Sequence, residues 1–242
     1  MKSYSFIDRY FHSEKELVDI RGMEGRDINT LFTYLNNLHS LSDKLKDNFD
    51  VSISSYPEFK VLRILRNYFH HVDDIDEIRF YANIKDNMTS YHVEQLVIPL
   101  NVWAKAVNNF KIQNTVPESR KDFKRKQDFI AKEFDKILDI CDCVELLESP
   151  ESYCRSLKLN CDGKVYDLGF DMFKYVYNIT NIISDVLREI DVVSNKAVVL
   201  GLDKTYSRDN CIPKFDINGH ASNNMLLTTE GYIYPDNVAA AI

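Results

Sequence analysis

Glycine and proline are scarce in this chain, at 7 and 6 of 242 residues. Both residue types interrupt helices, so their scarcity over this length favours a helical protein. No apolar run approaches the roughly 18 residues that a membrane span needs. Charged residues follow soon after Met1, before the apolar core of a signal peptide could form. We therefore expect a cytoplasmic protein that has no membrane partner.

Several motifs of cofactor and metal sites are also missing. The sequence contains neither GxxxxGK[ST] nor GxGxxG, which argues against a P-loop or Rossmann nucleotide site. The five cysteines include no CxxC pair, and Cys141 and Cys143 are separated by one residue. Buried thiols are therefore expected in place of a zinc or disulfide framework. No cofactor is predicted.

The charge balance is acidic, with 37 acidic and 30 basic residues and a formal charge of −7. This argues against a protein that coats nucleic acid non-specifically, although a local RNA site needs only a few cations. One basic cluster stands out, and it comprises Arg120, Lys121, Lys124, Arg125 and Lys126. A solvated helix face is the ordinary interpretation of such a cluster, and a surface that tracks phosphates is the alternative.

Apolar residues recur at three- and four-residue steps, which is the period of an amphipathic helix. The segments with this pattern are residues 27–47, 54–69, 91–110, 115–141 and 170–190. Asp27 is the expected N-cap of the first segment, and Pro57 belongs to the first turn of the second. The third segment contains Pro99, so its first part, residues 93–98, is alternatively a strand. Asp167 or Asp171 is expected at the start of the last helix.

Short β-structure is expected near two turn dipeptides. Asp162-Gly163 separates two short runs and is a strong hairpin signal. Glu230-Gly231 lies within a second possible hairpin over residues 226–234. The sequence thus predicts a mostly α fold, a helical bundle with a small β hairpin and a short β-containing C-terminal extension. The boundary is placed near residue 195, which gives a helical domain over 1–195 and an extension over 196–242.

The stretch Arg66-Asn67-Tyr68-Phe69-His70-His71 carries the chemistry of this chain. Arginine is a permanent cation whose planar fork fits phosphate, and histidine transfers protons near neutral pH. RNA cleavage without metal needs a base for the ribose 2′-hydroxyl and a cation for the charged phosphorus centre. Arg66 could be that cation and His71 the base or acid, while Asn67 could orient the imidazole or the phosphate.

Helix geometry decides which of these side chains can meet. Arg66 lies four residues before His70, and Asn67 lies four residues before His71, so both pairs are neighbours on a helix. Arg66 and His71 are five residues apart and would share a site if the helix ended near His71. The aspartates that follow favour such an end, because Asp is a poor residue for a helix interior. His70 is therefore a competitor of His71 for the catalytic assignment.

This stretch resembles the motif of the HEPN superfamily (higher eukaryotes and prokaryotes nucleotide-binding), an arginine followed after four to six residues by a histidine. Asn67 matches the polar residue that often follows the arginine. The resemblance implies an all-helical domain over residues 1–195 and a metal-independent endoribonuclease with Arg66, Asn67 and His71 as catalytic residues. It further implies RNA as a partner, a homodimer, and a role in toxin–antitoxin or antiphage systems, where a neutralising antitoxin or regulatory protein is a possible partner.

Three other interpretations stand beside this one. The arginine and histidines could only neutralise the helix dipole and the acids that follow, namely Asp73, Asp74, Asp76 and Glu77. His70, His71 and these acids could instead bind a divalent ion in a metal-dependent phosphohydrolase, with His39 and His92 as further ligands. The chain could also be a non-catalytic HEPN-like interaction or regulatory module in a larger defence complex.

Overall fold

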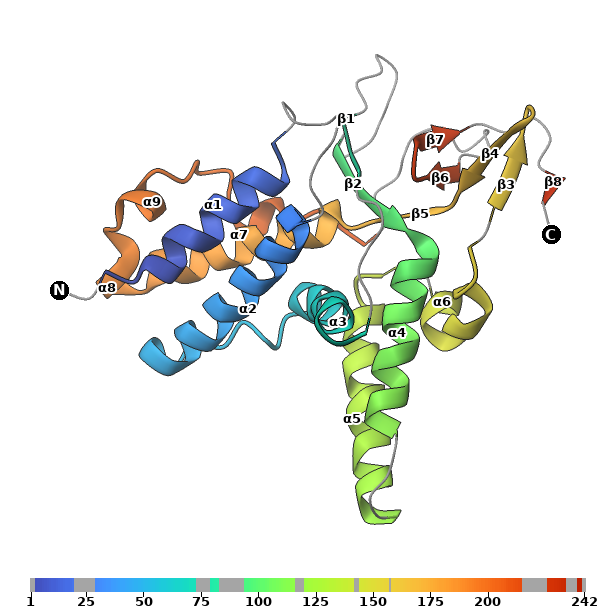
Figure 1. Cartoon of the computed structure of the whole chain (residues 1–242). Coiled ribbons are helices and arrows are strands. Elements are labelled where there is room, and N and C mark those ends of the chain that lie inside the picture. The colour runs from blue at the N-terminus through green and yellow to red at the C-terminus, as the bar shows by residue number, and fades with distance from the viewer. Residues whose placement is uncertain are drawn as a thin grey trace.

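The protein is described from a computed structural model, which covers residues 3–19, 29–72, 79–82, 94–115, 120–141, 144–156, 158–214, 226–233 and 239–240. Most of these residues are helical, and the strands form small antiparallel sheets (Figure 1). The prediction of a mostly α fold is therefore confirmed.

The helices follow one another through most of the chain. They are α1 (Ser5–Leu17), α2 (Asn29–Phe49), α3 (Pro57–His71), α4 (Leu100–Thr115), α5 (Arg120–Leu138), α6 (Val144–Glu148), α7 (Phe173–Glu189), α8 (Asp191–Ser194) and α9 (Ala197–Leu200), with short 3-10 turns η2 (Pro150–Tyr153) and η3 (Arg208–Asn210). None of the helices in these described segments has the length and apolar character that a membrane-spanning helix requires.

The strands form three small sheets. They are β1 (Arg79–Ala82), β2 (Glu94–Pro99), β3 (Lys158–Cys161), β4 (Lys164–Asp167), β5 (Gly169–Asp171), β6 (Leu226–Thr228), β7 (Gly231–Ile233) and β8 (Ala239–Ala240). The strand orders are β1-β2-β5, β4-β3-β8 and β6-β7, and every pairing is antiparallel. Both predicted hairpins are present, as β3–β4 and β6–β7. In the first turn Asp162 and Gly163 have φ values of 51° and 78°, as a type I′ turn requires.

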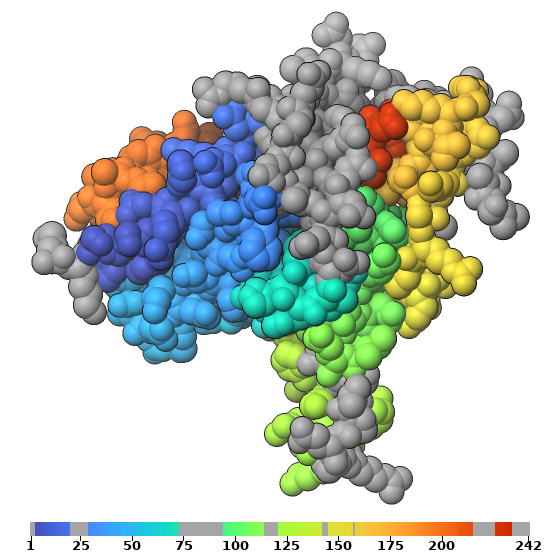
Figure 2. Space-filling view, viewed as in Figure 1, coloured from blue at the N-terminus to red at the C-terminus, as the bar shows by residue number. Residues whose placement is uncertain are grey.

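Helix α3 lies at the centre of the molecule, where it packs against α2, α4, α5 and α7 (Figure 1). It starts as the sequence predicts, with Tyr56 in an extended N-cap conformation and Pro57 in the first turn. Its apolar face is buried through Phe59, Leu62 and Leu65. Figure 2 shows the surface of α3 between those of α2 and α4, while α4 and α5 project away from the rest as an arm.

The structure decides the alternatives at residues 91–110. Residues 94–99 form strand β2, and α4 begins only at Leu100, directly after Pro99. Strand β2 is the middle strand of its sheet, and its central residues 95–98 are all buried. Asp171 is the aspartate at the start of α7. Its Oδ1 accepts hydrogen bonds from the backbone amides of Leu96 and Phe173, at 2.9 and 2.8 Å. Asp167 instead ends strand β4.

Some expectations need correction or lie outside the described residues. Helix α1 is absent from the predicted segments, although its buried residues have helical spacing. Phe32 is one of the apolar residues that recur at helical spacing over residues 27–47, but it is 38% exposed. Asp27 and Cys143 fall outside the described residues. The other cysteines are free thiols, with Cys141 and Cys161 buried as expected and Cys154 and Cys211 half-buried.

The chain after residue 195 returns to the helices at the start of the protein. Helix α9 contacts α1 and α7, and η3 contacts α7. The side-chain amide of Asn178 on α7 bonds both backbone groups of Ile212, at 2.9 Å to its oxygen and 2.7 Å to its nitrogen. Ile212 is itself part of the hydrophobic core. The domain boundary near residue 195 stays a prediction.

Candidate functional site

The motif Arg66–His71 occupies the last turns of α3, which ends at His71. The amide of Val72 closes the helix by donating to the carbonyl oxygen of Tyr68 at 2.9 Å. Arg66 and Asn67 are half-buried, whereas His70 and His71 are exposed. The helix end that the sequence analysis required for a shared Arg66–His71 site is therefore present.

Arg66 is held by two neutral amide oxygens. Its Nε donates to Oδ1 of Asn36 on α2 at 3.3 Å, and its Nη1 donates to Oδ1 of Asn67 at 3.4 Å. Within the described ranges no carboxylate forms an ion pair with this guanidinium. Amide oxygens orient an arginine without cancelling its charge, so Arg66 keeps its full attraction for an anion.

Lys60 and Arg63 on the same helix differ from Arg66, because they do have a carboxylate partner. Both pair with Glu133 of α5, and the Arg63 Nη2 lies 2.5 Å from Glu133 Oε2. Lys60 and Glu133 are buried. These two cations therefore share one carboxylate and hold α3 against α5.

The two histidines of the motif are side by side at that end. The ring centroids of His70 and His71 are 4.6 Å apart with an interplanar angle of 61°. Asn67 contacts Arg66 and has no hydrogen bond with either imidazole in the part of the chain that the structure describes. Asn67 therefore positions the guanidinium, a role that differs from the two expected from the sequence, orientation of the imidazole or of the phosphate.

His39 is a further imidazole near Arg66 that the sequence analysis considered only as a possible metal ligand. It lies on α2, three residues after Asn36, and its ring is stacked on Phe59 of α3 at 6.3 Å. Its Nε2 lies 3.8 Å from Oδ2 of Asp43. Burial lowers the pKa of His39, Arg66 and Arg63 lower it further, and Asp43 opposes them. The lowered pKa favours the neutral form of the imidazole, which is able to accept a proton.

Nothing in the sequence alone brings Asn36 and His39 to Arg66. The signal is tertiary, because it depends on how α2 packs against α3. Helical spacing only shows that Phe32, Asn36 and His39 share one face of α2.

The metal interpretation rests on residues that the structure does not describe. Asp73, Asp74, Asp76, Glu77 and His92 all lie outside the described residues. Within the described ranges there is no group of three or more His, Cys, Asp or Glu residues placed to hold a metal ion.

The chain was compared with protein families, curated proteins and solved structures. No family model matches the chain, and no curated protein or solved structure matches it either.

Proposed function

We propose that this protein is a metal-independent endoribonuclease of the HEPN type that cleaves RNA at the C-terminal end of α3. The observation that carries the proposal is the set of contacts around Arg66. Its guanidinium is fixed by two amide oxygens, has no described carboxylate partner, and lies one turn before two exposed imidazoles.

The chemistry follows from these groups. The ribose 2′-hydroxyl attacks the neighbouring phosphorus while a histidine takes its proton, and the bond from phosphorus to the 5′-oxygen breaks. A second imidazole protonates that oxygen, which leaves a 2′,3′-cyclic phosphate and a 5′-hydroxyl. Arg66 stabilises the charge on the phosphorus centre, and His71 acts as base or acid. Asn67 and Asn36 hold the guanidinium in place.

A homodimer would supply the second imidazole. Two exposed apolar residues flank the motif, Phe32 at 38% and Val72 at 50% exposure. Phe32 lies one helical turn before Asn36, the partner of Arg66, and Val72 directly follows His71. Burial of this apolar surface against a second copy would bring the two motifs together in one groove. A toxin or antiphage effector, restrained by an antitoxin or regulatory protein, is the biological role proposed for such an enzyme.

The alternative is a non-catalytic HEPN-like module in a larger defence complex. The net charge of −7 favours this alternative, because a nuclease gains from a positive field around its substrate. In that case the exposed apolar residues beside the motif would meet another protein, and substitution of His71 would alter assembly without any effect on RNA.

The test is cleavage of labelled RNA by the purified protein and by Arg66→Ala and His71→Ala variants. Each substitution is expected to reduce the rate roughly 10²-fold or more, as loss of a phosphate clamp or a general base does. Melting temperatures should change little, because both side chains are partly or fully exposed and truncation costs about 1 kcal/mol or less. Cleavage should survive EDTA and yield a 2′,3′-cyclic phosphate.

Matched controls separate the possible assignments. Arg155→Ala removes an exposed arginine that lies outside α3 and outside the basic cluster of α5, and its cleavage rate should equal that of the unmodified protein. If His70→Ala abolishes cleavage and His71→Ala does not, the catalytic histidine is His70. His39→Gln tests whether the neutral imidazole on α2 takes part. Activity that EDTA removes and a divalent ion restores would refute the metal-independent mechanism.

A further inference from the structure

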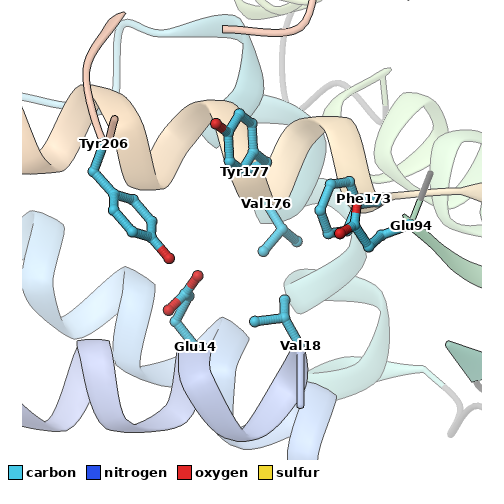
Figure 3. Close-up of a pocket in the computed structure, with 7 residues that line it drawn as sticks. All are labelled: Glu14, Val18, Glu94, Phe173, Val176, Tyr177 and Tyr206. Atoms are coloured by element: carbon cyan, nitrogen blue, oxygen red, sulfur yellow. The ribbon is translucent and has the colours of Figure 1, made fainter. Parts of the chain in front are cut away.

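A cavity of about 190 Å³ lies between α1, α7 and the segment that follows α9 (Figure 3). None of its lining residues belongs to α3, so it is separate from the candidate nuclease site. Its walls combine three aromatic rings, from Phe173, Tyr177 and Tyr206, with the carboxylates of Glu14 and Glu94. No lysine or arginine is among the lining residues.

Glu14 is the unusual residue of this cavity. It is only 4% exposed, and its carboxylate points into the cavity toward the hydroxyl group of Tyr206 (Figure 3). Across the described part of the chain it has neither an ion pair nor a side-chain hydrogen bond. Burial raises the pKa of Glu14 to about 7, and the neighbouring Lys15 only partly opposes this. A buried carboxylate without a partner is costly, so a cation that pairs with it would be bound favourably.

The aromatic walls are fixed in place before any ligand arrives. The rings of Phe173 and Tyr177 on α7 are stacked at 5.9 Å with an interplanar angle of 13°. The segment that carries Tyr206 is anchored by Arg188 of α7, which donates to the backbone oxygens of Tyr206 and Asp203. A preformed wall spares a ligand the entropy cost of ordering these side chains.

We propose that this cavity binds a small organic cation, an ammonium group that carries methyl or other short alkyl substituents. Aromatic faces attract such cations through their negative π surfaces, and a carboxylate supplies the opposite charge. Val18 and Val176 complete the lining and offer apolar contact to the alkyl groups. The cavity volume of about 190 Å³ limits the ligand to a small molecule. An anion is disfavoured, because the lining contains two carboxylates and no cation.

The test uses choline as the probe and 3,3-dimethyl-1-butanol as its neutral isostere. Binding is followed at pH 8, where Glu14 is ionised, through the methyl NMR signals of Val18 and Val176. Choline is expected to shift these signals in a saturable way and to bind at least tenfold more tightly than the neutral isostere. Glu14→Gln should weaken choline binding at least tenfold and leave the isostere unaffected.

Two further pairs of variants show whether the geometry is responsible. Tyr206→Phe keeps the aromatic face and should retain choline binding, whereas Tyr206→Leu removes the face and should weaken it severalfold. Glu189→Gln alters an exposed carboxylate on the same helix as Tyr177 and should change nothing.

Three outcomes would overturn the proposal. One is that neither choline nor tetramethylammonium shifts the valine signals at 10 mM. Another is equal affinity for choline and its neutral isostere, which would mean that charge plays no part. The third is unchanged choline binding in Glu14→Gln and Tyr206→Leu, which would place the ligand elsewhere. Because RNA cleavage depends on α3, these results are independent of the proposed nuclease.

Discussion

Replacement of Glu14 by glutamine should make the stability of this protein less sensitive to pH. The carboxyl group of Glu14 is buried between α1 and α7, and burial raises its pKa from an ordinary value of 4.5 to about 7. The buried hydroxyl groups around it do not titrate in the same range. Burial raises the pKa of Tyr10 and Tyr34 far above neutrality and that of Tyr206 to about 12.

The direction in which stability changes with pH follows from proton binding. Between pH 4.5 and about 7 the folded protein keeps a proton on Glu14 that the unfolded chain has already released. The stability that this proton contributes is fully present below pH 4.5 and is lost as pH rises through about 7. A shift of this size corresponds to a total loss of about 3 kcal/mol in the free energy of unfolding. Glutamine has the same shape and stays neutral, so the Glu14→Gln variant should not show this loss.

Urea unfolding measures the effect directly, since Trp103 is the one tryptophan of the sequence and is fully buried against Phe170. The free energy of unfolding is determined at several values between pH 4.5 and 8.5 for both proteins. The free energy of unfolding of the variant minus that of the parent protein should rise by about 3 kcal/mol across this range. All other ionisable groups are shared, so their contributions cancel in the difference.

Glu189→Gln is the matched control, because Glu189 is exposed on α7. The free energy of unfolding of this control should stay within about 0.5 kcal/mol of that of the parent protein at every pH. A Glu14→Gln difference that does not change with pH would refute the reasoning, since the carboxylate would then be ionised in both states. The same result would mean that the carboxylate of Glu14 is solvated or paired, which contradicts the unpaired burial on which the cation proposal depends.

Three further predictions concern positions where the structure shows a specific contact. Asn36→Ala removes one of the two acceptors that orient Arg66, so RNA cleavage should slow roughly tenfold or more while the melting temperature stays nearly unchanged. Glu133→Ala leaves two cations of α3 without their partner and should lower the free energy of unfolding by about 3 to 5 kcal/mol in urea titrations. Asn178→Ala breaks both bonds to Ile212 and should cost about 2 kcal/mol, with faster hydrogen exchange at the Ile212 amide.

Local patterns in the sequence predicted the helices and hairpins best. The leucines of α2 are buried at the expected spacing, and Asp162-Gly163 forms the turn that its composition indicates. These features depend on neighbours within a few residues. Phe32 is the exception on α2, because helical spacing gives the side of a helix but does not say how far a neighbouring helix covers it.

Contacts between distant segments were not predictable in the same way. Strand β2 pairs with β5, whose residues lie 70 or more positions later, so residues 91–110 alone could not decide between helix and strand. Glu14 gave no sign of burial, since glutamate is usually found at the surface. Its environment depends on α7 and on the return of the chain at Tyr206. Functional residues of this kind become visible only when the tertiary structure is known.

The cations of α3 bear on the competing interpretations of the motif. Lys60 and Arg63 show what structural cations look like on this helix, since both pair with the buried carboxylate of Glu133. Arg66 lies one turn further on and bonds amide oxygens in place of a carboxylate. Among the described residues this choice of partner fixes the guanidinium without an opposing carboxylate. Burial lowers the pKa of His39, and the charge of Arg66 lowers it further. An arginine that served only to hold two helices together would gain more from a carboxylate, whereas one that binds phosphate needs to remain unneutralised.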